Sequence, residues 1–282
     1  MSGARIKIVT DSSCDLPIAL AAEKGIDVVP LAIRFGDEEL FDRRDLTPKQ
    51  FWERCAASPV LPETAAPSPG SFEQVFRAAR ADGFEGVVCI NLSSKLSATR
   101  DSALAGAKAL DGVIPVNVVD SLSVTMGLGM IVLAAQRAAS EGGGLEDVTA
   151  IALDAAQRTR VYGTLDTLEN LKKGGRIGKA QSLLGSLLSI KPIIELRDGS
   201  VEPGPKQRTR ARALAWLAQQ VKDRPSVDEV AVIHGEAPDI GKLIELLAPQ
   251  VPREKIIVAD LGAVIGTHAG PRTIGVAFQV KR

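Results

Sequence analysis

The sequence predicts an α/β protein made of two α/β domains, with mainly parallel sheets covered by helices. Three observations support this class. Short apolar runs alternate with amphipathic segments of helical length. The runs are apolar almost without interruption, which is typical of parallel strands covered on both faces. The 282 residues allow one large domain or two of ordinary size, and we favour two.

The expected strands are the apolar runs at 6–10, 86–90, 116–120, 161–165, 190–196, 229–234, 255–261 and 273–280. A helix follows Ser94, because apolar residues recur there on one helical face. The three glycines in 140–148 end one helix and precede another. The domain junction is therefore placed shortly afterwards, giving predicted domains 1–155 and 156–282.

Two further segments have a distinct composition. Residues 60–72 contain three prolines and a glycine, which predict an irregular, stiff loop that carries Thr64 ahead of a helix. Residues 168–196 join a basic glycine turn, with Arg176, to an intensely apolar helix. Ordinary core is the simplest interpretation of that helix, although its leucines are also suited to the wall of an apolar cavity: Leu183, Leu184, Leu187 and Leu188.

Composition argues against several classes of function. Lys plus Arg and Asp plus Glu both number 34, and aromatic residues make up only 4%. Clustered basic charge and aromatic stacking platforms are therefore missing, which excludes a nucleic-acid partner. Cys14, Cys55 and Cys89 show no paired spacing of the kind that a zinc or redox site needs. The start of the sequence has no secretory pattern. The longest apolar run of the whole sequence is shorter than the roughly 18 residues that a membrane span needs. We therefore expect a cytoplasmic protein without integral membrane association.

Hydroxyl groups gather where the strand at 86–90 meets the following helix. Ser93, Ser94, Ser97 and Thr99 lie within about one turn of the helix start, where unpaired N–H groups and the helix dipole favour an anion. The simple alternative is that one hydroxyl caps the helix and the others are solvated. Similar junctions follow two other strands, and their carboxylates, Asp11 and Asp120, are better suited to tether amides and hydroxyls than to bind metal.

The sequence lacks the known nucleotide-binding motifs, so no cofactor is expected. The glycines from Gly174 lack the spacing and the final Ser or Thr of a phosphate loop. A serine nucleophile needs a base, and the sequence has two histidines, His234 and His268. His234 is interpreted as structural. His268, placed in a Gly/Pro turn between two apolar strands, is either structural or part of a site.

Together these stretches resemble the DegV family from residue 5 to residue 280. The resemblance rests on "TDSSCDLP" at 10–17, Thr64 in "TAAPSPG", "SSKLSAT" at 93–99, "VVDS" at 118–121, the segment 170–194 and "GTHAGP" at 266–271. It implies a long-chain fatty acid bound in a cavity between two α/β domains. It also implies the role of the acyl-presenting subunit (FakB) of bacterial fatty acid kinase, whose separate ATP-using subunit phosphorylates the bound carboxylate.

The resemblance also implies roles for individual residues. Thr64 and Ser93 would hold the carboxylate with help from the Ser94 amide, and His268 would stand beside the head group. Arg176 and Ser97 would contact the head group or the kinase. The sequence departs from the family pattern at four positions that affect the expected acyl-chain preference and kinase docking: Ala65, Ala66, Ala98 and Arg272.

The expected function is therefore non-catalytic lipid binding, with a fatty acid as ligand and the kinase catalytic subunit as partner. Burying some 14 methylenes contributes on the order of 11 kcal/mol before ordering costs, so the tail supplies affinity and the head group sets position. The alternative from another class is a serine-dependent hydrolase or acyltransferase that uses Ser93 and His268. A sensor of small anions, with a pocket too short for a lipid, is a third possibility.

Overall fold

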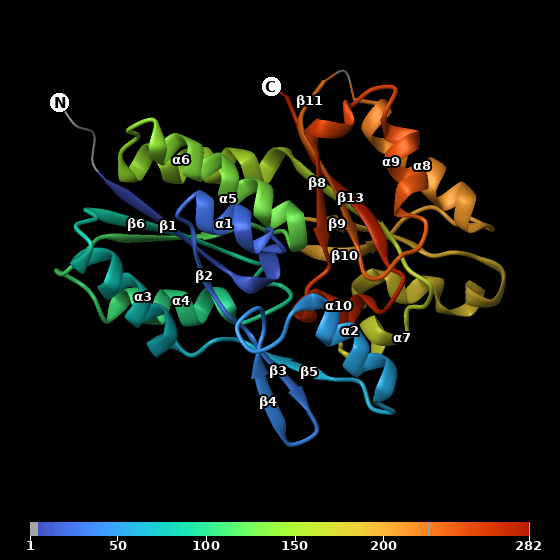
Figure 1. Cartoon of the computed structure of the whole chain (residues 1–282), viewed down its shortest axis with the longest axis horizontal. Helices are drawn as coiled ribbons and strands as arrows, with labels where there is room; N and C mark the ends of the chain where they lie inside the picture. The colour runs from blue at the N-terminus through green and yellow to red at the C-terminus, as the bar shows by residue number, and fades with distance from the viewer. Residues whose placement is uncertain (1–4, 225, 282) are drawn as a thin grey trace.

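The computed structural model describes residues 5–224 and 226–281, apart from the side chains of residues 185–189 and 228. The predicted cavity-wall residues Leu187 and Leu188 therefore lie outside the described side chains. The chain forms two large sheets and one small sheet with helices around them (Figure 1). The predicted α/β class is confirmed.

The first sheet is parallel throughout, as predicted. Its strand order is β2 (Asp27–Val29), β1 (Ile6–Asp11), β6 (Gly86–Asn91) and β7 (Val116–Asp120). Four long helices flank it in two pairs (Figure 1): α3 (Pro69–Ala81) with α4 (Thr99–Lys108), and α5 (Thr125–Ser140) with α6 (Leu145–Arg158). Strand β6 is buried along its whole length, which explains its uninterrupted apolar sequence.

The second sheet corrects the prediction of mainly parallel strands. Its order is β10 (Ser200–Pro203), β9 (Ile193–Arg197), β8 (Thr159–Thr164), β13 (Ile274–Val280), β11 (Val227–His234) and β12 (Ile256–Asp260). Only β11 and β12 pair in parallel, and the other neighbours are antiparallel. The apolar runs reflect burial on both faces. Val232 and Val276 face a cluster with helices α8 (Arg210–Lys222) and α9 (Ile240–Leu247), whereas Ala231 and Ala277 face the larger core.

A small antiparallel sheet was not expected from the sequence. It consists of β4 (Glu38–Phe41), β3 (Ala32–Phe35) and β5 (Glu63–Ala65), and α2 (Pro48–Ala57) lies between β4 and β5 in the chain. Thr64 pairs with the buried Ile33 in this sheet. The predicted loop at 60–72 therefore contains a strand at Thr64, and the backbone of Thr64 is fixed by strand pairing.

The remaining short elements connect these layers: η1 (Ser12–Cys14), α1 (Ile18–Glu23), α7 (Glu169–Lys173), η2 (Gly178–Ser189), η3 (Arg253–Lys255) and α10 (Ala263–Ala269). The apolar segment after Arg176 is a 3-10 helix, and His268 lies in the last turn of α10 instead of a loop between strands. Residue 155 lies inside α6, and the division into domains 1–155 and 156–282 remains a prediction.

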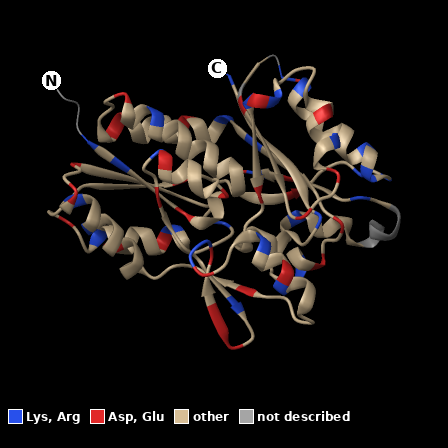
Figure 2. Cartoon of the chain, in the orientation of Figure 1, with Lys and Arg blue, Asp and Glu red and all other residues tan. Residues whose placement is uncertain are grey.

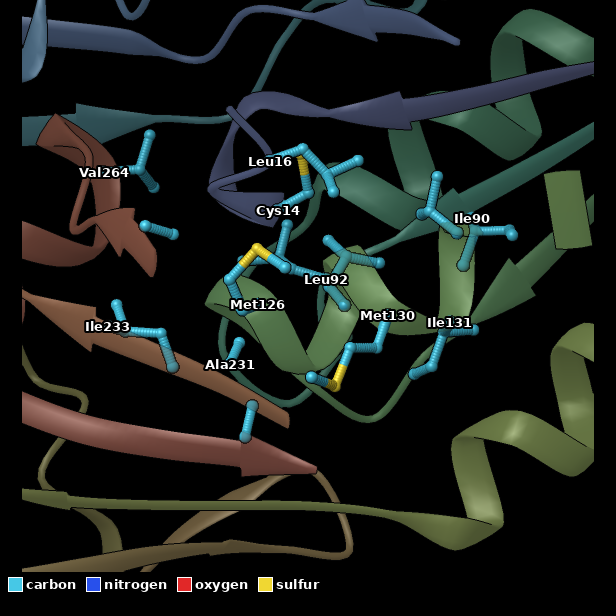
Figure 3. Close-up of a cluster of buried hydrophobic side chains, with 14 of the residues drawn as sticks. Cys14, Leu16, Ile90, Leu92, Met126, Met130, Ile131, Ala231, Ile233 and Val264 are labelled. Carbon is cyan, nitrogen blue, oxygen red and sulfur yellow. The ribbon is translucent and has the colours of Figure 1, made fainter. Parts of the chain in front are cut away.

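The main core is continuous from the first sheet to the second through α5. Figure 3 shows Met126 and Met130 of α5 among side chains from both sides, including Ile90 of β6 and Ile233 of β11. Twelve of the sixteen residues of α5 are buried, so this helix is covered nearly all round. Over the part of the chain that the structure describes, acidic and basic residues are interspersed among the helices and strands (Figure 2), as expected from the balanced charge.

Candidate functional site: an apolar cavity with a polar mouth

A cavity of about 250 Å³ lies between the second sheet, α10 and the segment that follows β6. Leu92 and Leu96 line it from that segment, and Val264 lines it from α10. Ile233 of β11 and Ile194 of β9 line it from the second sheet. The site therefore combines residues of the second sheet with segments that follow strands of the first sheet, and it forms only when these parts pack together.

The cavity has a solvent-facing mouth and a buried interior. Lining residues Ala65 and Ala98 are exposed, and four polar lining residues beside them are partly exposed: Thr64, Ser97, Arg176 and His268. Most of the buried lining is apolar, and six of its residues are no more than 3% exposed: Leu31, Leu92, Leu165, Ile233, Leu261 and Val264. Thr125, Tyr162 and Thr273 are buried polar residues in the same lining. A ligand that fits this distribution has a long apolar part and one polar end.

Thr64 and His268 meet at the mouth, although 204 positions separate them in the sequence. The Thr64 Oγ1 atom lies 3.0 Å from Nε2 of His268. Strand pairing with β3 fixes Thr64, and His268 projects from the end of α10, whose Thr267 carbonyl accepts a hydrogen bond from Asn170. The two predicted head-group residues are thus brought together by different parts of the fold.

His268 is neutral at physiological pH. Burial and the nearby Arg176 guanidinium lower the pKa of His268 from 6.5 to about 4. The imidazole packs so closely against Gly174 that a Cβ added there would lie 2.2 Å from Nδ1 of His268. Gly174 has an ordinary helical φ of −75°, so it is required for space rather than for backbone conformation. The sequence placed this glycine in a turn and did not indicate its contact with His268.

Arg176 and Ser97 also line the mouth. Arg176 donates from Nε to the Leu96 carbonyl at 3.1 Å and from Nη1 to the Gly174 carbonyl at 2.7 Å. Ser97 accepts a hydrogen bond at 3.3 Å from the backbone N–H of Thr99, the first residue of α4. The guanidinium is therefore held at the mouth by neutral carbonyls, and its charge is not cancelled by a carboxylate among the hydrogen bonds found there.

Ser93 and Ser94 do not line the cavity in this structure. The buried Ser93 hydroxyl donates to the Gly199 carbonyl at 2.7 Å. The Ser94 hydroxyl and backbone N–H both donate to Asp120, at 2.5 and 3.2 Å. Asp120 thus tethers an amide and a hydroxyl, as predicted. Asp11 does the same with Ser13 and the Leu92 N–H.

A buried ionic cluster supports α10 at its other end, and sequence reasoning missed it. The Asp15 carboxylate accepts hydrogen bonds from the Gly262 N–H at 2.9 Å and from Arg43 at 3.1 Å. Gly262 is the N-cap of α10. Asp42, also fully buried, has a pKa raised from 3.8 to about 7 by desolvation, which outweighs the attraction of Arg43. The cluster fixes the helix that presents His268.

The described residues contain no group of three or more His, Cys, Asp or Glu side chains that could hold a metal ion. Within the same residues, no helix is both long and apolar enough to cross a membrane. His234, interpreted as structural, ends β11 and lies 3.5 Å from Asp260 on the neighbouring strand. It does not line the cavity.

A family model described as "Uncharacterised protein, DegV family" matches residues 5–281. This chain belongs to the DegV family. A DegV domain-containing protein of Streptomyces coelicolor is 37% identical over 279 residues, which cover 97% of this chain and 98% of that protein. The match extends over the whole predicted resemblance, which is thereby confirmed at the level of the family.

Solved structures that share the fold include proteins described by their fatty acid binding. A DegV family protein from Thermus thermophilus, described by its fatty acid binding, has a TM-score of 0.90 and 34% identity, covering 98% of this chain and all of that chain. A stearic acid-binding protein from Eubacterium ventriosum has a TM-score of 0.83 and 26% identity, covering 97% and 98% of the two chains. Fatty acid binding is therefore a property of these structural neighbours.

Proposed function

We propose that this DegV family protein binds one long-chain fatty acid in the cavity and presents its carboxylate at the mouth to a separate ATP-dependent kinase subunit. The observation that carries the proposal is the grouping of four polar lining residues, Thr64, Ser97, Arg176 and His268, at the mouth of a mainly apolar cavity. The protein acts in the cytoplasm and catalyses no reaction itself. The fatty acids bound by its structural neighbours support the ligand class.

The mouth provides hydrogen-bond donors and one positive charge for a carboxylate. A hydroxyl has a single proton, so Thr64 can donate to a ligand only if His268 donates to Thr64. The neutral His268 can do so when its proton is on Nε2, the atom 3.0 Å from Thr64. We infer this tautomer for the loaded protein. Arg176 adds charge beside it, and the Ser93 hydroxyl can join only after leaving the Gly199 carbonyl.

A serine hydrolase using Ser93 and His268 is not favoured by the geometry. A nucleophile and its base must lie within hydrogen-bond reach of each other. The Ser93 hydroxyl instead donates to Gly199, while Nε2 of His268 is engaged with Thr64. The two residues of the alternative mechanism thus have different partners.

Removing the Thr64 hydroxyl tests the head-group site. Native mass spectrometry of delipidated protein mixed with stearate should show one acyl chain per monomer. Thr64→Val keeps the shape but loses a hydrogen bond to a charged group, which costs about 1.5 kcal/mol or roughly tenfold in affinity. Binding of stearyl alcohol, which has no carboxylate, should change less than threefold.

Thr149→Val is the matched control, because the Thr149 hydroxyl bonds to Asn117 and to the Leu145 carbonyl away from the cavity. Thr149→Val should leave the affinities for stearate and for stearyl alcohol unchanged. A wild-type protein that retains no acyl chain and takes up none from added stearate would remove the proposal.

The kinase partnership has a separate test. The loaded protein, ATP and a purified catalytic subunit of a bacterial fatty acid kinase should together form an acyl phosphate, trapped by hydroxylamine as the acyl hydroxamate. Omission of either protein should abolish the product. Hydroxamate formed without the kinase subunit, or none formed with subunits that are active on their own carriers, contradicts presentation to a kinase.

A further inference from the structure

Two walls of the cavity meet along a narrow seam. One wall is the segment 93–98, in which Leu96, Ser97 and Ala98 line the cavity. The other consists of Arg176 and the β9–β10 hairpin, in which Leu196 and Val201 line it. Ala98, on the seam, is exposed to solvent. The seam therefore extends from the solvent at the mouth toward the apolar interior.

Two side-chain hydrogen bonds join these walls. Ser93 Oγ donates to the Gly199 carbonyl at 2.7 Å, and Arg176 Nε donates to the Leu96 carbonyl at 3.1 Å. By contrast, the segment 93–98 is held on its own side by bonds to neighbouring loops. The Ser93 N–H donates to the Ser123 carbonyl at 2.9 Å, and Ser94 donates to Asp120. Parting the walls thus breaks two bonds and leaves the anchors of the segment in place.

The turn that meets Ser93 is shaped for close contact. Asp198 and Gly199 form the two-residue connection between β9 and β10, with φ values of 49° and 79°, as expected for an Asp-Gly hairpin turn. A Cβ added to Gly199 would lie 2.4 Å from Ser93 Oγ and 3.0 Å from Leu122. The glycine therefore serves both the turn conformation and the contact that closes the seam.

We propose that this seam, between residues 93–98 and the pair Arg176 and Gly199, is the gate through which the acyl chain enters and leaves the cavity. The inference rests on the proposed function. Six apolar residues of the lining are no more than 3% exposed, so an acyl chain of 16 or 18 carbons reaches them only when the walls part. The Ser93 hydroxyl has one proton, so a carboxylate that recruits it also releases the Gly199 carbonyl and weakens the seam.

A disulfide across the seam tests the gate. The Cβ that a residue at position 199 would carry lies 3.5 Å from the Ser93 Cβ, which is within the range for a disulfide. We would combine Ser93→Cys with Gly199→Cys in a Cys55→Ser background, because Cys14 and Cys89 are buried and Cys55 is only partly so. The delipidated protein is oxidised, and stopped-flow fluorescence follows uptake and release of cis-parinaric acid.

The oxidised protein should take up and release the probe at least tenfold more slowly than the same protein after reduction. The dissociation constant of the probe should change less than these two rates, because a closed gate slows uptake and release together. Ser93→Cys alone, which cannot close the bridge, should be insensitive to the oxidant. Gly199→Ala, whose added methyl group pushes against Ser93, should exchange the probe faster than wild type.

Equal rates of probe uptake and release before and after reduction would overturn the gate. Failure of the two cysteines to cross-link would also overturn it, because the walls would then not be adjacent in solution. A locked protein that loses affinity without slower release would also count against it. Wild-type protein that binds no probe would instead refute the proposed function itself. The two failures are therefore distinguishable.

Discussion

Val264→Trp should raise the dissociation constant for stearate at least 100-fold. Val264 is 3% exposed, projects from α10 and lines the interior of the cavity, and it belongs to the core cluster shown in Figure 3. An indole in this place occupies space that the tail needs. Excluding about four methylenes costs roughly 3 kcal/mol at about 0.8 kcal/mol each, which corresponds to a loss of the order of 100-fold.

The matched control is Val258→Trp. Val258 is 44% exposed on β12 and does not line the cavity, so its replacement should leave the affinity within about twofold of wild type. Isothermal titration of delipidated proteins measures the affinities, and circular dichroism verifies that both variants are folded. A folded Val264→Trp protein that binds stearate normally would show that the tail lies elsewhere.

His268 and Asp42 should make opposite contributions to the pH dependence of stability. The His268 pKa falls from 6.5 to about 4 on folding, so between these values the unfolded chain binds more protons and acid destabilises the fold. The Asp42 pKa rises from 3.8 to about 7 on folding, so the folded chain binds the proton and acid stabilises it. From pH 7.5 to 5, each group changes the free energy of unfolding by about 2 kcal/mol, with opposite sign.

Single substitutions should separate the two contributions. Relative to wild type, His268→Asn should gain about 2 kcal/mol of stability as the pH falls from 7.5 to 5, whereas Asp42→Asn should lose about as much. Urea unfolding of the ligand-free proteins at several pH values measures both trends. Parallel curves for wild type and both variants would contradict the assigned pKa shifts.

Three strands of the first sheet, β1, β6 and β7, were predictable from their apolar runs, whereas β2, with only three residues, was not predicted. The direction of the strands in the second sheet was not predictable. An uninterrupted apolar sequence indicates that both faces of a strand are covered, but it does not indicate the direction of the neighbouring strands. Strand β13, between β8 and β11, is covered by α8 and α9 on one face and by the main core on the other. The small sheet escaped notice because its strands have only three or four residues.

The candidate site was predictable only in part. Asp11 and Asp120 were expected to tether amides and hydroxyls, and the structure confirms this role. Two of the partners, Leu92 and Ser94, lie 81 and 26 positions away in the sequence. The contact between Thr64 and His268 joins residues 204 positions apart, and only the family resemblance placed them together. The Asp15–Arg43 pair at α10 and the Ser93–Gly199 bond depend on tertiary packing that no local pattern reports.

The position of α5 restricts how this protein can have changed through descent. One helix, buried on nearly every side, packs against both large sheets. A recombination event that replaced one half of the gene would bring in a sheet whose surface had not evolved to pack against α5. We therefore expect the lineage to have inherited this chain as one piece, with its ligand preference drifting by small substitutions around the cavity.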